Sequence, residues 1–306
     1  MPYKNAVIIR KIFIASCMLF ASWTAIAQEL FVSTEPASNI ASGMSGFRLN
    51  TKFFHMASDG SYTYRINPEL IFGIGKEWML RLNFYGSDIY QPGFKMEGGS
   101  AYVKYRFYNS DDIHSHLRLA AFGRMSIIDN PAVIQTHYTY YMTGSNGQME
   151  EHDGLRPYPS DEIDLEGNNS GFLAGMVATK LVHKMAISSS AYIINRWDNL
   201  QSPKSPLQSN LAVNYTLSAG YLLFPRVYKN FSQTNLNLYC ELLGSSSLDK
   251  KAYFIGIAPA IQFIFNSISR LDLSYRTQIT GDMNRLSKNY FLVRFEFDLQ
   301  NNHSRR

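Results

Sequence analysis

Apolar and polar residues alternate one by one along most of the chain after residue 27. In one such stretch, the apolar residues Tyr62, Tyr64 and Ile66 are separated by Thr63 and Arg65. This period of two is typical of β-strands with one apolar and one polar face, because successive Cβ atoms of a strand point to opposite sides. No stretch after residue 27 approaches the roughly 18 consecutive apolar residues of a membrane-spanning helix. The pattern predicts an all-β protein.

Alternating runs of similar length recur from residue 46 to residue 299. The predicted strands are 46–56, 61–74, 77–87, 97–108, 116–128, 170–182, 185–196, 208–224, 233–244, 252–265, 269–280 and 289–299. Their lengths are close to the ~9–11 residues that a tilted strand needs to cross a bilayer. They predict a transmembrane antiparallel β-barrel of about twelve strands, an even number. The runs 170–182, rich in Gly and Ala, and 185–196, with three consecutive Ser, are less secure, so 10 or 14 strands stay open.

The connections between the predicted strands are alternately short and long. Short turns are expected at 75–76 and 183–184, and long connections at 129–169 and 197–207, while 57–60 is a short exception. Membrane barrels show this asymmetry, because their periplasmic turns are short and their extracellular loops are longer. A soluble β-sandwich would also alternate, and the sequence alone does not distinguish inside from outside. A soluble sandwich, however, would have no reason to alternate short and long loops.

The composition favours the membrane barrel over the sandwich. Charged residues make up 17% of the chain, below the roughly 25% of soluble globular proteins. Aromatic residues reach 14%, with 20 Tyr and 20 Phe. A membrane barrel needs such residues, because one face of every strand contacts lipid and aromatic girdles lie at both interfaces.

The first 27 residues have the features of an export signal. Lys4, Arg10 and Lys11 precede an uncharged, mostly apolar stretch at 12–26, and Ala25-Ile26-Ala27 forms a small-x-small cleavage site. Lipidation at Cys17 is the alternative, but the apolar stretch before it is very short. The predicted organisation is a signal peptide (1–27), a lead-in segment (28–45), an outer-membrane β-barrel (46–299) and a polar tail (300–306).

Cleavage after residue 27 changes the charge and the cysteine count. The mature chain has 26 basic and 24 acidic residues, so the high pI partly reflects the signal peptide and nucleic-acid binding loses its support. Only Cys240 remains, which excludes an intrachain disulfide and a Cys-based zinc site. No cofactor is expected.

The polar face of the strands is strongly basic. With the apolar face toward lipid, this face lines the lumen. Its basic members are Arg48, Lys52, Arg65, Arg81, Lys104, Arg106, Arg118, Arg124, Lys180, Arg276 and Arg294, and its acidic members are Glu69, Glu241, Asp272 and Glu296. A basic constriction eases the passage of anions, so we expect a narrow passive channel with a weak preference for small anionic solutes. The alternative is a lumen filled by Arg–Glu pairs, with no conduction.

The long connection 129–169 is a second candidate site. It is acidic and tyrosine-rich, with Glu150, Glu151, Asp153, Asp161, Glu162, Asp164 and Glu166 beside His137, His152, Tyr138, Tyr140, Tyr141 and Tyr158. Carboxylates suit Ca²⁺, but no EF-hand spacing is present, and a solvated loop or pore lid is the simpler interpretation. This loop supports the alternative function of a non-conducting structural or adhesive surface barrel.

Enzyme motifs are absent from the sequence. No G-x-S-x-G, P-loop or H-E-x-x-H occurs, and no predicted strand carries the His-x-Ser of an outer-membrane phospholipase. The His114-Ser115-His116 triplet falls at a predicted periplasmic turn, and His55 and His183 fall at strand ends. We therefore expect no enzymatic activity.

Several segments resemble a family of uncharacterised outer-membrane barrels of the Bacteroidota that are loosely described as transporters. The resembling stretches are EPAS at 35–38, GGSAYVKYRF at 98–107, RLAAFGR at 118–124, NYTLSAG at 214–220, QTNLNL at 233–238 and residues 258–266. The resemblance runs from about residue 30 to 299. It implies a barrel in the outer membrane of a Gram-negative cell, with lipid and the barrel assembly machinery as partners. Twelve-stranded porins for acidic oligosaccharides are similar in strand count, but no motif matches them. One departure is that a polar tail follows Phe297, where such barrels commonly end.

Overall fold

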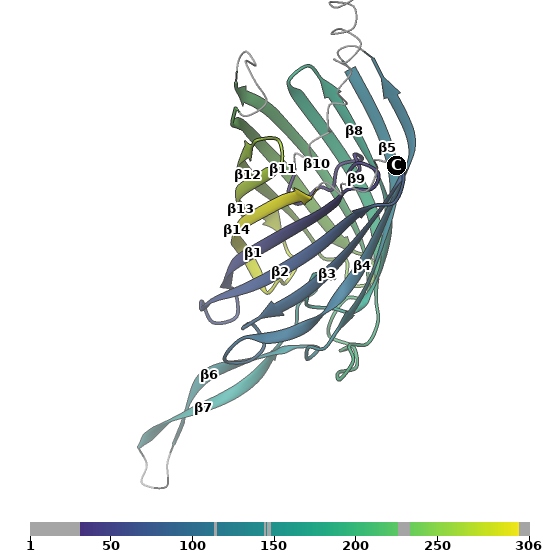
Figure 1. The fold of residues 1–306 in the computed structure, drawn as a ribbon. Helices are drawn as coiled ribbons and strands as arrows, with labels where there is room; N and C mark the ends of the chain where they lie inside the picture. The colour runs from purple at the N-terminus through teal and green to yellow at the C-terminus, as the bar shows by residue number, and fades with distance from the viewer. Residues whose placement is uncertain (1–30, 113–114, 144, 146–147, 226–232, 300–306) are drawn as a thin grey trace, which may run out of the picture.

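The computed structural model describes residues 31–112, 115–143, 145, 148–225 and 233–299. Twelve of its strands form one closed antiparallel barrel, and two more form a separate hairpin (Figure 1). The predicted signal peptide, the first residues of the lead-in segment and the polar tail lie outside the described residues. Within the described ranges, no helix has the length and apolar character needed to cross a membrane.

The barrel contains every strand that the alternation predicts, including the two less secure ones. The strands are β1 (Ser45–Met56), β2 (Tyr62–Gly73), β3 (Trp78–Ser87), β4 (Lys95–Asp111), β5 (Ser115–Ile128), β8 (Gly171–Val182), β9 (Met185–Arg196), β10 (Leu211–Phe224), β11 (Asn235–Ser247), β12 (Tyr253–Phe265), β13 (Ser269–Gly281) and β14 (Ser287–Leu299). Each pairs with its neighbours in sequence, except that β5 pairs with β8 across the hairpin. The prediction of twelve strands is confirmed.

The first and last strands close the barrel. Phe47 of β1 lies opposite Leu70 of β2 and Phe297 of β14, so apolar residues of three strands share the outer face. Asn50 lies opposite Asn67 and Arg294 on the inner face. Closure leaves no unpaired sheet edge, which a strand structure in lipid cannot tolerate.

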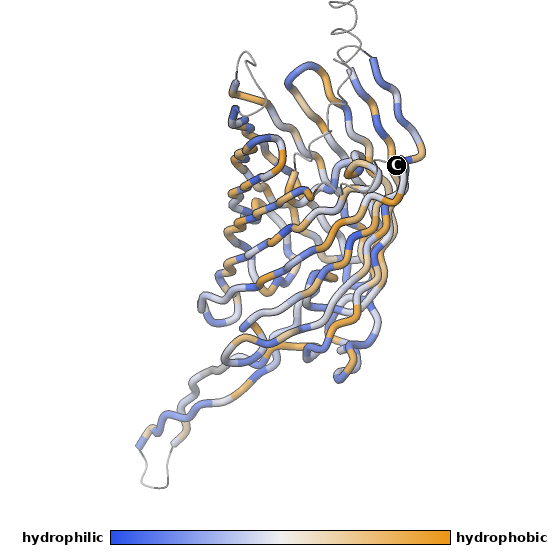
Figure 2. Tube along the Cα trace, in the orientation of Figure 1, coloured by the Kyte–Doolittle hydropathy of each residue, from blue (hydrophilic) through white to orange (hydrophobic). Residues whose placement is uncertain are grey.

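The outer surface of the barrel is apolar. Large side chains such as Leu238, Leu242, Phe291 and Phe295 alternate with inward polar ones and remain exposed, and Figure 2 shows this alternation along the strands. A continuous apolar surface of this kind is rare on soluble monomers, and it matches the lipid-facing band of a membrane barrel. Most large apolar side chains of the strands therefore face outward, and the lumen is mainly polar, with small apolar clusters.

We expect Leu242→Arg to lower the free energy of unfolding by about 2–4 kcal/mol, because a charge near the middle of the apolar band must leave water. Leu242 lies in the middle of β11 with 41% of its surface exposed. Equilibrium unfolding in lipid vesicles would measure the loss. The control is Tyr62→Arg, at the start of β2 and 82% exposed, which should cost far less. Equal losses at the two positions would contradict the assigned lipid belt.

The two ends of the barrel differ in their connections. β1 begins where β14 ends, since Ser45 pairs with Leu299. At this terminal end most connections are short, the one at 225–234 between β10 and β11 being the exception. Asn266 and Ser267, between β12 and β13, both adopt positive φ, as a type I′ turn requires. At the opposite end lie the long connections 129–170 and 197–210.

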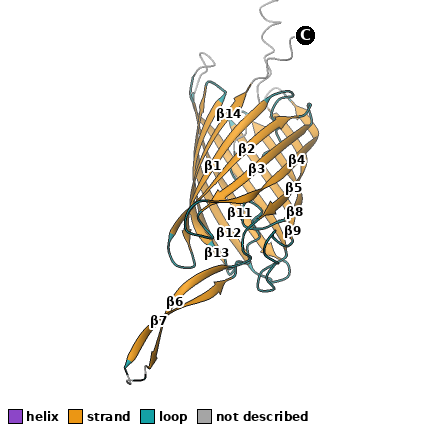
Figure 3. Ribbon diagram, turned by 60° about the horizontal axis from the view of Figure 1, so that its bottom comes forward, coloured by secondary structure: helices purple, strands orange, loops and turns teal. Residues whose placement is uncertain are grey.

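The long connection between β5 and β8 has two parts. Its first part is the hairpin β6 (Ile134–Thr143) and β7 (Met149–Tyr158), which projects away from the barrel (Figure 3). No strand was predicted here, although Ile134, Tyr140 and Met142 of β6 share one face. The sequence of β7 is polar on both faces and has no apolar stripe. Its second part, residues 159–170, folds back into the barrel and is called the inner loop below.

Candidate functional site

The lumen holds a second non-strand segment, residues 31–44, which we call the plug segment. The Glu241 carboxylate on β11 accepts hydrogen bonds from the backbone N–H groups of Val32 (3.1 Å), Ser33 (2.9 Å) and Thr34 (2.7 Å). The Thr34 hydroxyl also lies 2.6 Å from the Ser218 hydroxyl on β10. Backbone N–H groups inside a barrel need such partners, so Glu241 fastens the start of the plug segment to one wall.

Glu35 fastens the plug segment to strands on another part of the wall. Its carboxylate lies 2.6 Å from Arg81 on β3, 3.3 Å from Lys104 on β4 and 3.8 Å from Arg48 on β1. Lys104 also donates to the carbonyl oxygens of Pro36 (2.7 Å) and Ser38 (2.5 Å). Because β11 and β3 lie far apart in the strand order of the barrel, the plug segment crosses the lumen.

The surroundings of Glu35 keep it ionised. Burial alone would raise the pKa of its carboxyl, but the positive charges of Arg81, Lys104 and Arg48 outweigh burial and hold the pKa well below its ordinary value of 4.5. A group with a lowered pKa in the folded state contributes stability above its ordinary pKa, and this contribution is lost as the pH falls through the lowered value. The ion pairs of Glu35 therefore persist at pH 5.

Acidification from pH 7 to pH 5 should leave the plug segment in place, whereas Glu35→Gln should loosen it at both values. The physical reason is that the substitution removes the charge that Arg48, Arg81 and Lys104 share, while mild acid does not. Protease accessibility of the plug segment in the refolded barrel would measure both. Release of the wild-type plug segment between pH 7 and pH 5 would refute this assignment.

Arg48 is the centre of a buried ionic network on the inner wall. Its side chain is fully buried and contacts Glu296 (2.8 Å), Glu69 (3.2 Å) and Glu35 (3.8 Å). Glu296 is in turn paired with Arg270. A buried charge is tolerated only when partners of opposite charge surround it, so this part of the lumen is a packed polar core.

The inner loop carries acidic and apolar residues in alternation. Glu166 lies 2.5 Å from Lys52 and 2.7 Å from Arg124, while Glu162 lies 2.8 Å from Arg285. Asp164 is 3.5 Å from Arg65. The acidic residues thus face the basic strands β1, β2 and β5 and the connection before β14.

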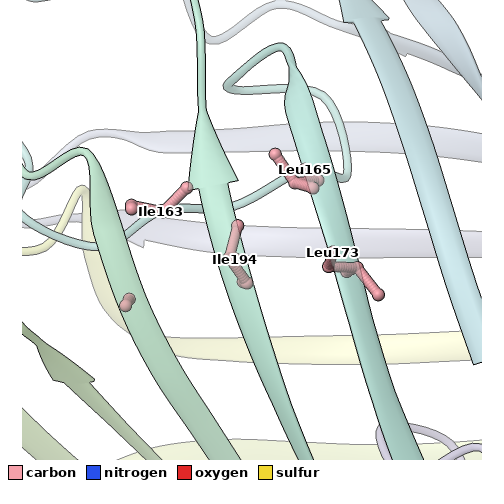
Figure 4. Packing of buried hydrophobic residues seen from close by; sticks show 5 residues of the cluster. Ile163, Leu165, Leu173 and Ile194 are labelled. Atoms are coloured by element: carbon pink, nitrogen blue, oxygen red, sulfur yellow. The ribbon is translucent and has the colours of Figure 1, made fainter.

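The apolar residues of the inner loop face another part of the wall. Ile163 and Leu165 pack against Leu173 on β8 and Ile194 on β9, all four almost fully buried (Figure 4). Because a strand-like period of two places neighbours on opposite sides, one short loop satisfies both a charged and an apolar wall.

A cavity of about 190 Å³ remains between the plug segment and the inner loop. Aromatic and aliphatic side chains form part of its wall, and ionisable ones form the rest. Its ionisable lining is Lys52, Arg65, Arg81, Arg124, Arg276, Arg285 and Arg294 on the basic side, and Glu35, Glu69, Glu162, Asp164 and Glu166 on the acidic side. Seven basic against five acidic residues leave it with a positive balance.

The structure places most of the predicted lumen residues on the inner face. Those buried or half-buried there are Arg48, Arg65, Arg81, Lys104, Arg124, Arg276, Arg294, Glu69, Glu241, Asp272 and Glu296. Arg118 also faces inward, near the terminal end, where it donates to Ser38 Oγ of the plug segment (3.0 Å) and to Asn109 Oδ1 (3.0 Å). Arg106 lies at the terminal end itself and donates to the Lys76 carbonyl (2.6 Å).

Lys180 was expected in the lumen and lies on the outside. It is exposed, and its neighbour Thr179 faces inward and accepts a hydrogen bond from the backbone N–H of Ala37 (2.9 Å). The inward position on β8 belongs to the odd-numbered residues, which include Leu173 and Val177. Because Gly and Ala occur on both faces of this strand, its sequence does not show which positions face inward.

The expected excess of lumenal basic charge is largely compensated by acids that the strand pattern does not reveal. Four of them, Glu35, Glu162, Asp164 and Glu166, belong to the plug segment and inner loop. Glu97 on β4 bonds Arg65 at 2.7 and 3.0 Å. It precedes an irregularity at Gly98 that shifts the inward parity. Arg270 and Asp298 occupy the same alternating positions of their strands as Asp272 and Glu296. The sequence pattern could therefore have placed these two residues in the lumen.

The described residues contain no group of three or more His, Cys, Asp or Glu side chains suited to a metal ion. The acidic connection 129–169 is divided between an exposed hairpin and ion pairs with lumenal basic residues. Its acids in the inner loop are therefore held by Lys and Arg.

No protein-family model matches the sequence, and no curated protein is significantly similar to it. Among solved structures, an outer-membrane channel from Pseudomonas putida F1 superimposes with a TM-score of 0.54 at 10% identity, over 88% of this chain and 100% of that one. A KdgM porin gives a TM-score of 0.44 at 6% identity, over 82% and 98% of the two chains. A NanC porin gives 0.44 at 10%, over 82% and 100%. At this level of identity, the first likeness establishes the fold: this chain folds as an outer-membrane channel does.

Proposed function

We propose that this protein is a narrow passive channel of the bacterial outer membrane, closed at rest by the plug segment and weakly selective for small anionic solutes. The observation that carries the proposal is the cavity between the plug segment and the inner loop, with its positive balance of ionisable side chains. The apolar outer face supports insertion into outer-membrane lipid. Export and insertion would involve the signal peptide and the barrel assembly machinery.

The contacts that hold the plug segment support a channel that can open. Hydrogen bonds and ion pairs with side chains, such as those of Glu241 and Arg81, hold its first half, together with small apolar contacts of Phe31 and Ala37. Its backbone bonds to a barrel strand lie at its end, where Gly43 and Met44 pair with Gly73 of β2. Polar contacts of this type can be exchanged for water at modest net cost, because water makes the same hydrogen bonds. A twelve-stranded barrel is intermediate in width between side-chain-filled and open barrels, so its lumen can carry solute once the segment leaves.

The charges along the cavity support the anion preference. Glu166 is shared by two cations, Lys52 and Arg124, and Glu162 by Arg276 and Arg285. Each of these trios carries one net positive charge. Inside a wall of low dielectric constant, such fixed charges favour entry of anions over cations.

Reversal potentials across planar bilayers in a KCl gradient test this function. Refolded mature protein and a variant without the plug segment should both give currents with a chloride preference, small in the first case and larger in the second. The substitution Arg276→Gln, which leaves Glu162 paired with Arg285, should reduce the preference. Cation selectivity, or no current from either protein, would refute the proposal.

A second candidate function rests on the hairpin β6–β7. It projects beyond the barrel with exposed Tyr141, Met142, Met149 and Leu155, a surface that could adhere to other molecules. Deletion of residues 134–158 separates the two functions. Loss of cell-surface adhesion with unchanged currents would assign adhesion to the hairpin, in addition to conduction.

A further inference from the structure

The cavity behind the plug segment has a wall of three aromatic rings. Tyr102 on β4 stacks on Phe122 of β5 with centroids 5.8 Å apart and planes at 28°. Phe122 meets Tyr192 of β9 edge-on at 5.7 Å. All three line the cavity, and the inner-loop residues Ile163 and Leu165 extend the apolar surface. Phe122 and Tyr192 also pack against the buried cluster around Ile163 and Leu165. The ring surface that they leave toward the cavity can attract an aromatic or aliphatic solute in the same way as the rings attract one another.

A cationic group stands at one end of the aromatic row. The Arg124 guanidinium lies 5.7 Å from the Tyr102 ring, and that of Arg81 lies 4.4 Å from the same ring. Arg124 is only 8% exposed, yet its Nε donor has no hydrogen-bond partner among the described residues. A buried donor without a partner is costly, and Arg124 lines the cavity, so its guanidinium is the cation that an anionic group of a solute would meet there.

Glu166, the acid nearest to Arg124, does not neutralise the positive charge of this site. Glu166 accepts from Arg124 Nη1 at 2.7 Å and from Lys52 at 2.5 Å, so one carboxylate serves two cations. Asp164 is a further acidic neighbour of Lys52, so the positive charge that faces the aromatic row is that of Arg124. It excludes cationic solutes and favours a single negative charge at that end.

The size of the cavity limits the solute. An apolar cavity of about 150 Å³ is known to admit a benzene molecule, and this cavity measures about 190 Å³. One ring with a short charged substituent fits this volume, and an oligosaccharide does not.

From these observations we infer that the cavity binds small aromatic monoanions, with the ring against Tyr102 and Phe122 and the anionic group at Arg124. The inference rests on the proposed function for its biological meaning, since it names the solute class that the channel takes. The binding site itself is defined by the geometry of the wall, whether or not solute passes through the barrel.

Ligand-observed NMR titrations of the refolded mature barrel in detergent test the inference with five probes. Benzoate and cinnamate have both the ring and the charge, acetate has only the charge, benzyl alcohol has only the ring, and benzylammonium has the opposite charge. We expect benzoate and cinnamate to bind at least about tenfold more tightly than the other three, since the bidentate anion contact and the ring contact each contribute. Equal affinities for benzoate and acetate, or tighter binding of benzylammonium, would overturn the inference.

Substitutions locate the site within the lumen. Arg124→Gln should weaken benzoate binding about tenfold, and Glu166 keeps Lys52 as a partner in this variant, so the barrel can fold. Phe122→Ala should weaken it as well. The matched control is Arg118→Gln, on the same strand and the same face but outside the cavity lining, which should bind benzoate like wild type. Unchanged affinity in folded Arg124→Gln would refute the assigned site.

The two proposals fail in different ways. Benzoate binding without any current in bilayers would contradict the channel function and leave the site intact. Chloride-selective currents without specific benzoate binding would support the channel and contradict the aromatic solute class.

Discussion

Deletion of residues 28–42 should raise the single-channel conductance of the refolded barrel by about an order of magnitude, because conductance depends steeply on the free cross-section of a narrow pore. Among the deleted residues, 31–42 cross the lumen between Glu241 on β11 and Arg81 on β3. Their removal leaves Arg48, Arg81 and Lys104 with one fewer carboxylate, so the opened pore should also become more selective for chloride. Single-channel recordings in planar bilayers would measure both quantities.

Two controls accompany this deletion. Removal of the hairpin residues 134–158, which project away from the barrel, should leave conductance unchanged. Glu241→Gln retains the side-chain shape but weakens the three bonds to the backbone of the plug segment, so it should give brief openings rather than a permanently open pore. A folded deletion variant with wild-type conductance would show that the plug segment does not close the channel.

Arg48→Met should lower the free energy of unfolding by about 3 kcal/mol, because removal of one partner leaves uncompensated charge in a buried network. Arg48 is fully buried and contacts Glu296, Glu69 and Glu35. Methionine fills a similar volume, so the loss reports the charge more than the packing. Equilibrium denaturation in lipid vesicles would measure this difference.

The control for Arg48 is Lys180→Met. Lys180 also lies on a barrel strand, but it is exposed on the outer face, and its replacement by an apolar residue should change stability little or raise it. A loss for Arg48→Met no larger than that for Lys180→Met would mean that the lumenal network contributes nothing to folding. It would also weaken the assignment of Arg48 as the centre of that network.

The pattern of the sequence by itself determined the strands and their two faces. Residues such as Tyr62, Tyr64 and Ile66 reveal a strand because the relevant signal lies between positions i and i+2, which is local information. The alternation of short and long connections indicated the order of the strands and distinguished the two ends of the barrel. The inward position of Arg48, Arg294 and Glu296 followed from the same parity. The alternation was not sufficient where Gly98 interrupts β4 or where Gly and Ala obscure the faces of β8. For these reasons Glu97 was not recognised as a lumenal acid, and Lys180 was wrongly placed in the lumen.

Only the tertiary structure decided what the lumenal charges contact. Glu241 binds the backbone of Val32 across 209 positions of the chain, and Arg285 binds Glu162 across 123. The plug segment has no strong periodicity of its own, and the alternation in the inner loop covers only residues 162–166. Neither pattern indicates that the segment folds into the barrel. Their position follows from the need of buried arginines for carboxylates and of a narrow lumen for filling. That need arises only after closure of the barrel, and for this reason the strands could be predicted from sequence while the plug segment, the inner loop and the cavity between them could not.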